Sequence, residues 1–316
     1  MSGRKRVASA PVSQSSAGIL LGSILDYAGT FPPARLRLAE ALANYARDRS
    51  GRHAWMLGRF VLALARLKEF EELAASFERG ESPWELSLVL SGEPGQEIEH
   101  IQRFNERWSG KATIVSVEIP PLEPSAIGRV ARRLPGAVEA FFEVSVDRSL
   151  VDQGPLDPRL DARLAAIAAS GASAKVRTGG VSADAFLSTT QLCRFISSCG
   201  VARVAFKATA GLHHALGGRY PVTYDPDSPS AVMHGFLNVC AAAALMHSGV
   251  IESREAPDVL DESSAEAFKF LPDSFAWRDR RVAARDLADT RRSFFRSFGS
   301  CSFREPIEDL ERLRIL

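Results

Sequence analysis

Several features that would assign this sequence to a specialised class are scarce or missing. Only four of its 316 residues are cysteines, and none forms a C-x-x-C pair, so neither a zinc knuckle nor a disulfide framework is predicted. The net charge of +1 provides no whole-protein field for nucleic acid or an anionic membrane. The longest apolar run, "AGILLGSIL", is too short to span a bilayer. We therefore expect a cytoplasmic protein with no nucleic-acid or membrane partner.

What the sequence does contain is typical of a globular protein. Hydrophobic residues make up 46% of the chain and charged residues 24%, and a chain of this size buries roughly three quarters of its unfolded surface. Residues 1–17 carry Arg and Lys but no acid, and we expect a disordered tail there in preference to a transit peptide.

Short apolar segments alternate with helical patterns along the rest of the chain. Eight segments look like strands, namely "GSILDYAG", "HAWMLGRFVLA", "WELSLVLSG", "ATIVSVEIPP", "VEAFFEVSVD", "SAKVRTGG", "VARVAFKATAG" and "FFRSFGSCSF". Eight strand-helix units predict an α/β fold, a (β/α)8 TIM barrel, over residues 18–316. Residues 252–292 are charged and helix-like, which indicates a helical insertion before the last strand.

Period-two alternation within these segments predicts which side chains enter the barrel. In "TIVSVEI", Thr113, Val115, Val117 and Ile119 share one face, and Ile114, Ser116 and Glu118 share the other. The apolar face should meet the outer helices, so the polar face points inward. The polar and charged residues expected inside are Asp26, Arg59, Glu85, Ser87, Ser116, Glu118, Glu143, Ser145, Asp147, Lys175, Arg177 and Lys207.

Charges in a barrel interior need partners, because an unpaired buried ion costs several kcal/mol. Two lysines and several acids on one inner face are more typical of a functional site than of structural ion pairs. For a single strand-end lysine, the structural explanation would suffice.

The segments "AKVRTGG" and "VAFKATAGL" resemble the sixth and seventh strands of deoxyribose-phosphate aldolase and its class I aldolase relatives. Lys175, Thr178 and Gly179 match that family's K-x-x-T-G signature, and Phe206, Lys207 and Gly211 match most of F-K-x-x-G-G. "RFVLA" and "RSFGSCSF" resemble further family segments more weakly. The chain thus looks like a divergent member of this superfamily.

The resemblance implies a covalent mechanism. It makes Lys175 the nucleophile that forms a Schiff base with a carbonyl substrate, and Lys207 the second lysine that keeps the first partly neutral. The family's fourth-strand aspartate aligns with Ser116, a departure from its pattern. Glu118, Glu143 or Asp147 would then transfer the proton, or the reaction differs. Asp26 joins this catalytic group from the first strand.

The resemblance also implies a phosphate site at the ends of the last strands. Its candidates are Gly179, Gly180, Gly211, Gly299, Ser300 and Ser302, with Arg59, Arg177, Thr178, His213 and His214 as further substrate contacts. Ala210 and the sequence "GSCS" depart from the family pattern here, so a phosphorylated substrate is less secure than the Schiff base.

Histidine and cysteine side chains could provide a metal site or a thiol nucleophile instead. His213, His214, His234 and His247 follow the seventh strand, but an adjacent pair binds one metal only with special backbone geometry. We predict no metal and no cofactor, and expect His213 or His214 at the mouth of the pocket. Cys301 has no histidine near it in sequence, so a thiol nucleophile is not expected.

The inward-facing charges predict a functional site, and the resemblance implies a class I aldolase-like lyase that acts on a small carbonyl compound, phosphorylated or not, through Lys175. Two alternatives stay open: a non-covalent phosphate-binding isomerase or synthase that uses Glu118 and Glu143, and a barrel that has lost catalysis and serves in binding. A homo-oligomer is also open, since barrels often pair through outer helices.

Overall fold

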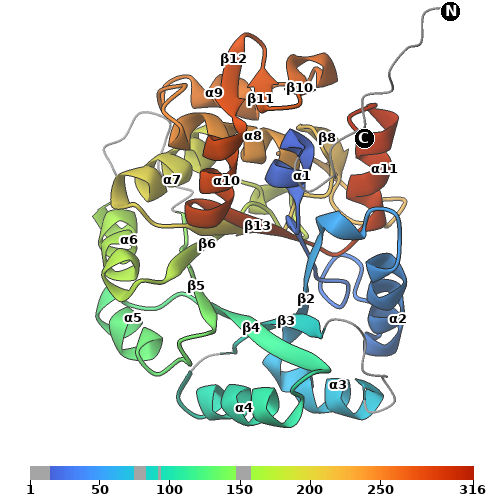
Figure 1. Ribbon diagram of the computed structural model, residues 1–316, viewed down its shortest axis with the longest axis vertical. Helices are drawn as coiled ribbons and strands as arrows, with labels where there is room; N and C mark the ends of the chain where they lie inside the picture. Colours follow the sequence, from blue (N-terminus) through green and yellow to red (C-terminus); the bar gives the residue numbers. More distant parts are fainter. Residues whose placement is uncertain (1–14, 75–82, 92–93, 147–157) are drawn as a thin grey trace, which may run out of the picture.

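The computed structural model describes residues 15–74, 83–91, 94–146 and 158–316. Across these residues, eight parallel strands close into a barrel in the order β1-β13-β7-β6-β5-β4-β3-β2 (Figure 1). The predicted (β/α)8 barrel is confirmed, and each of the eight strand-like segments contributes one strand to its wall. These strands are β1 (Leu25–Tyr27), β2 (Leu57–Ala63), β3 (Trp84–Val89), β4 (Ala112–Ile119), β5 (Glu139–Glu143), β6 (Ser173–Arg177), β7 (Phe206–Thr209) and β13 (Phe295–Ser300).

Helices surround the barrel and cover the apolar outer face of its strands (Figure 1). They are α2 (Leu38–Arg49), α3 (Leu67–Ala74), α4 (Pro94–Arg107), α5 (Pro124–Ala131), α6 (Pro158–Ser170), α7 (Thr189–Ala202), α8 (Phe236–His247), α10 (Ala284–Ser293) and α11 (Arg304–Arg312). Helix α8 is buried almost all round, because it lies between β13 and the helices α7 and α10. Its apolar sequence therefore reflects a central position among the helices.

The predicted inward face is confirmed on β5, β6 and β7. Glu143 pairs in register with Lys175, and Lys175 pairs with Lys207, so the three side chains share the inner face. Phe142 and Phe206 on the same strands point outward into the core. The rule works here because the ladders between these strands are regular, so the side-chain period of two is kept.

The prediction is wrong for the first half of β4, because the strand carries a bulge. Leu86 pairs with Ile114 and Ser87 with Ser116, so Val115 is one extra residue. Thr113 therefore faces inward with its partner Glu85, and Ile114 packs outward. Ser116 and Glu118, beyond the bulge, lie on the predicted inner face.

The bulge is held from outside the barrel by α4. The side chain of Asn105 accepts a hydrogen bond from the Ile114 N–H at 2.7 Å and donates one to the Ile114 carbonyl oxygen at 3.0 Å. A bulge disrupts the ladder and leaves backbone groups without their strand partners, and this amide replaces both partners.

The expected insertion before the last strand is only partly helical. Within residues 252–292 lie α9 (Ala256–Leu260), α10 and an antiparallel sheet of β10 (Phe268–Phe270), β11 (Ser274–Trp277) and β12 (Arg280–Ala283). The strands "FKF", "SFAW" and "RRVA" are too short for their period to stand out among charged residues, although Pro272-Asp273 and Arg278-Asp279 mark turns between them. The sheet packs against α1 (Ser16–Leu21), α8 and α10, on the outside of the barrel.

A second unpredicted element follows β7. Strands β8 (Gly218–Pro221) and β9 (Ser230–Met233) form an antiparallel hairpin before α8. Its connecting loop carries Tyr224, which reaches the end of β13 by a contact between its hydroxyl group and Cys301.

The predicted N-terminal tail of residues 1–17 extends too far, because its last residues are helical. Residues 1–14 lie outside the described residues, but Ser16 and Ala17 already belong to α1, whose first turn is capped by the Ser15 hydroxyl. Among the described helices, none combines the length and the apolar character that crossing a bilayer requires.

Candidate functional site

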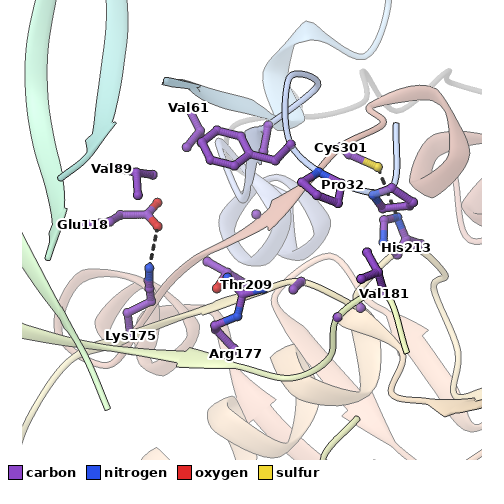
Figure 2. A pocket seen from close by; sticks show the side chains of 17 residues that line it. Pro32, Val61, Val89, Glu118, Lys175, Arg177, Val181, Thr209, His213 and Cys301 are labelled. Atoms are coloured by element: carbon purple, nitrogen blue, oxygen red, sulfur yellow. Dashed lines mark hydrogen bonds and ion pairs between the residues drawn. The ribbon is translucent and has the colours of Figure 1, made fainter. Parts of the chain in front are cut away.

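A cavity of about 190 Å³ opens at the carboxyl end of the barrel strands. Figure 2 shows Glu118 and Lys175 on one side of it and Cys301 and His213 on the other. The loop after β1 supplies much of the apolar wall. The residues that line the cavity are Ala28, Phe31, Pro32, Pro33, Val61, Val89, Glu118, Lys175, Arg177, Gly180, Val181, Thr209, Ala210, Gly211, His213, Gly299 and Cys301.

Lys175 projects from β6 into this cavity and is held by two carboxylates. Its Nζ donates to Glu118 Oε2 at 3.1 Å and lies 2.8 Å from Glu143 Oε2. Glu118 is almost fully buried, whereas 19% of the Glu143 side chain is exposed. Glu143 is therefore the carboxylate through which Lys175 is connected to solvent.

Lys207 lies deeper, on the neighbouring strand, and its side chain is fully buried. Its Nζ donates to Asp26 Oδ2 at 2.6 Å and to Glu118 Oε1 at 2.7 Å. The ring of Phe141 lies 5.2 Å from the same Nζ, within the range of a cation–π contact. Ser297 also donates a hydrogen bond to Asp26, at 2.7 Å. Lys207 is thus enclosed by acids, an aromatic ring and the barrel wall.

The two lysines and three acids form one network with Glu118 at its centre. Burial by itself raises the pKa of Glu118, but Lys207 and Lys175 outweigh it and lower that pKa to about 2. Burial likewise opposes ionisation of Asp26 and Lys207. Lys207 nevertheless lowers the pKa of Asp26, and the two acids raise the pKa of Lys207. At neutral pH, Asp26 and Glu118 are ionised and Lys207 is protonated.

This arrangement bears on the role expected for Lys207. The two Nζ atoms share Glu118, one oxygen each, so carboxylates are the nearest charges to both lysines. Repulsion between Lys207 and Lys175 is therefore screened by Glu118, and the geometry gives no direct like-charge contact to support that expectation.

Two of the three acids that the sequence left as alternatives for proton transfer lie beside Lys175. Glu118 and Glu143 both contact Lys175, while Asp147 lies outside the described residues. Ser116, which aligns with the family's aspartate, is buried, and its hydroxyl has no hydrogen-bond partner among the described residues.

Arg59 does not line the cavity, as its expected role in substrate binding would require. Its guanidinium donates to Glu139 Oε2 at 2.7 Å, and its backbone N–H donates to Asp26 Oδ1 at 3.0 Å. Arg59, Glu85 and Glu139 line a separate hollow at the amino end of the strands. Arg59 therefore holds Asp26 from the amino end of the strands, by its backbone hydrogen bond. Glu139 was not anticipated, although it lies in "VEAFFEVSVD" at an even spacing from Glu143, so the period of two could have placed it on the inner face.

The glycines expected to bind phosphate divide into two groups. Gly180, Gly211 and Gly299 line the cavity, whereas Gly179 is buried under Phe186. A Cβ atom at Gly179 would lie 2.4 Å from the Phe186 ring. Gly211 has a φ of +83° and its Cβ would meet the same ring at 2.8 Å. Close packing thus explains the glycine at both positions without a ligand.

The hydroxyl groups expected to bind phosphate have local partners. Thr178 donates to the Ala210 carbonyl, which ties the ends of β6 and β7 together. Ser300 Oγ accepts from the Ser302 N–H at 3.3 Å, and Ser302 Oγ accepts from the Glu305 N–H at 3.1 Å. Arg177 is the exposed cation at the mouth of the cavity. The geometry adds no support for a phosphate loop here.

His213 and Cys301 meet at the wall opposite Lys175, which the sequence did not predict. Cys301 Sγ lies 3.9 Å from His213 Nδ1, although 88 residues separate them in sequence. The absence of a nearby histidine in the sequence was therefore a poor reason to dismiss Cys301. His214 turns away from this contact toward Asp309 Oδ2, at 3.0 Å.

The other two histidines have structural partners outside the cavity. His234 lies 3.0 Å from the Leu187 carbonyl oxygen, and His247 lies 2.9 Å from Asp289 Oδ2. Within the described part of the chain, no three His, Cys, Asp or Glu side chains gather as a metal site would require.

The sequence was compared with known proteins. It matches no model of a known protein family, and no curated protein matches it either. The function of the site therefore rests on its own geometry and chemistry.

Proposed function

We propose that this protein is a carbon–carbon lyase of the class I aldolase type, which forms a Schiff base between Lys175 and a small carbonyl compound. The observation that carries the proposal is the position of Lys175 Nζ in the cavity, between Glu118 and Glu143. The carboxyl end of a barrel is where enzymes of this fold keep their active sites.

The first step is imine formation. Lys175 gives up a proton, and its Nζ then attacks the carbonyl carbon of the substrate. Loss of water leaves a protonated imine, which withdraws electrons from the adjacent carbon. Loss of the proton from the β-hydroxyl group then breaks the carbon–carbon bond, which releases an aldehyde and leaves an enamine on Lys175. Protonation of the enamine carbon restores the imine, and the same steps in reverse form the bond. Hydrolysis of the imine returns Lys175 and releases the product.

Two carboxylates within hydrogen-bond distance of Nζ serve these proton transfers. Glu143 takes the proton that leaves Lys175, because it is 2.8 Å from Nζ and is the carboxylate of the pair that contacts solvent. Glu118 has a pKa of about 2, so it remains ionised and stabilises the positive charge of the imine. Asp26 and Lys207 hold Glu118 in place from below.

The cavity favours a small substrate with an apolar portion. Its volume is about 190 Å³, and Phe31, Val61 and Val89 form part of its walls. Arg177 offers a cation at the mouth for an anionic group of the substrate. Because neither Ser300 nor Ser302 lines the cavity, an unphosphorylated carbonyl compound suits the site better than a sugar phosphate.

The test is reductive trapping of the imine. The protein is treated with sodium borohydride and a panel of small aldehydes and ketones, with and without phosphate, and the adducts are located by mass spectrometry of peptides. We expect a stable adduct on Lys175 that is absent in Lys175→Ala. Lys269→Ala is the matched control, since Lys269 is exposed on the outer sheet, and it should keep the adduct.

A second function is favoured by the same two acids. Glu118 and Glu143 flank an ammonium group, an arrangement that also suits a non-covalent isomerase or synthase, with Lys175 stabilising a developing oxyanion. Turnover of a substrate without any trapped adduct would select this function. Folded protein with neither adduct nor turnover would indicate a binding barrel.

A further inference from the structure

We propose that Cys301 and His213 form a second covalent site in the cavity, where the thiolate adds reversibly to the carbon of an aldehyde. The aldehyde as ligand rests on the proposed function, since it is the second product or reactant of an aldol reaction. The reactive thiol itself rests only on geometry.

The geometry consists of four side chains brought together from distant parts of the chain. Cys301 Sγ lies 3.9 Å from His213 Nδ1 and 3.5 Å from the Tyr224 hydroxyl. Glu305 Oε2 lies 3.5 Å from the same nitrogen of His213 and accepts a hydrogen bond from Tyr224 at 3.1 Å. Cys301 and Glu305 thus approach the same nitrogen of His213. Glu305 therefore stabilises the charge of the imidazolium, and the imidazolium in turn favours the thiolate, which is the reactive form of a cysteine.

The cluster has access to substrate. Cys301 and His213 both line the cavity that Lys175 lines, and they occupy the opposite side of it (Figure 2). A small molecule in this cavity is therefore enclosed between two nucleophiles, an amine and a thiol.

Charge favours the thiolate at Cys301 alone among the cysteines. Burial by itself raises the pKa of Cys301, but His213 and Tyr224 outweigh it and lower that pKa. Burial by itself lowers the pKa of His213, but Cys301 and Glu305 raise it to about 9. Burial raises the pKa of Cys193, Cys199 and Cys240, to about 12 for Cys240. The contact between Cys301 and His213 therefore favours an ion pair of thiolate and imidazolium over the neutral pair.

The covalent step balances without an oxidant. The thiolate sulfur forms a bond to the aldehyde carbon, and the π electrons of the carbonyl move to its oxygen. His213 transfers its proton to that oxygen, which gives a hemithioacetal and a neutral imidazole. Return of the proton to His213 reverses the addition, and the aldehyde is released facing the enamine on Lys175.

The first experiment measures the reactivity of the thiol. Iodoacetamide is added between pH 6 and 9, and alkylation of each cysteine is followed by peptide mapping. At pH 7, we expect Cys301 to react about tenfold faster than Cys193, Cys199 or Cys240, since thiolate content controls the rate. His213→Gln should slow Cys301 by about tenfold. His247→Gln is the matched control and should leave the rate within about twofold, because His247 contacts Asp289 outside the cavity.

The second experiment detects the adduct. Propanal labelled with ¹³C at C1 is added, and the hemithioacetal carbon is observed by NMR. Its resonance should appear in the wild-type protein and in Lys175→Ala, and should be absent in Cys301→Ser. In parallel, borohydride should still trap a carbonyl compound on Lys175 in the Cys301→Ser variant. The trapping experiment thus tests the Schiff base, and the NMR experiment tests the thiol site separately.

Two results would overturn the proposal. One is a Cys301 that reacts with iodoacetamide no faster than the three other cysteines. The other is a wild-type spectrum without the hemithioacetal resonance, or one whose resonance persists in Cys301→Ser.

Discussion

Lys175 and Lys207 are paired in register on adjacent strands, yet their ammonium groups are bridged by a carboxylate rather than opposed to each other. The carboxylate belongs to Glu118, which binds one lysine with each oxygen. A site that places two buried cations side by side depends on such a bridge, because burial of an uncompensated charge is costly.

Glu118→Gln removes the bridging charge but keeps the shape of the side chain. We expect a loss of about 3–5 kcal/mol in the free energy of unfolding, because two buried ammonium groups each lose a charged partner. Urea unfolding at pH 7 measures it. Glu143→Gln is the matched control: Glu143 binds Lys175 alone and is partly exposed, so its loss should be clearly smaller. Equal losses would contradict the central position of Glu118.

The same carboxylate should make stability depend on pH in the acid range. The pKa of Glu118 in the folded protein is about 2, below the ordinary value of 4.5. A carboxyl group with a lowered pKa stabilises the folded protein at pH values above its pKa in the unfolded state. That stabilisation is lost as the pH falls from about 4.5 toward 2. Unfolding free energies measured from pH 6 to pH 2 should therefore decline more steeply in wild type than in Glu118→Gln. Parallel curves would rule out the depressed pKa.

Lys207 and Asp26 should be strongly coupled, because their side chains are 2.6 Å apart and both are buried. Lys207→Met leaves Asp26 and Glu118 without this cation, and we expect it to lower the free energy of unfolding by about 3–5 kcal/mol. Asp26→Asn should lower the free energy of unfolding much less in the Lys207→Met background than in the wild-type protein. A double-mutant cycle by urea unfolding measures the coupling, and simple additivity of the two losses would refute it. The exposed Lys269→Met serves as a control for the change of residue type.

Gly179 should tolerate no side chain while Phe186 keeps its position. Gly179→Ala places a Cβ 2.4 Å from that ring, and overpacking of this kind costs about 1–3 kcal/mol. Thermal unfolding detects it, and Phe186→Leu in the same chain should recover part of the loss. Gly136→Ala is the control, because nothing lies within 4 Å of a Cβ there. A neutral Gly179→Ala would mean that the loop shifts freely and that close packing does not explain this glycine.

The sequence was most informative where a strand alternates regularly. The inward positions of Asp26, Lys175 and Lys207 follow from the period of two, which depends only on the backbone. The bulge at Val115 could not be predicted in this way, because an extra residue leaves no mark in the alternation and its backbone is bonded by a distant side chain of α4. Pattern reading cannot bring together residues as distant as His213 and Cys301, since their contact is made by barrel closure and by the loops around the mouth.

The bulge at Val115 decides which side chains of β4 face inward. Counted from Thr113, which faces inward opposite Glu85, strict alternation would send residue 118 outward into the helices. The extra residue at Val115 reverses that count, so Glu118 enters the barrel. One extra residue thus places a carboxylate between the two lysines. Asn105 stabilises the bulge from the far side of the wall, and it is not among the residues that line the cavity.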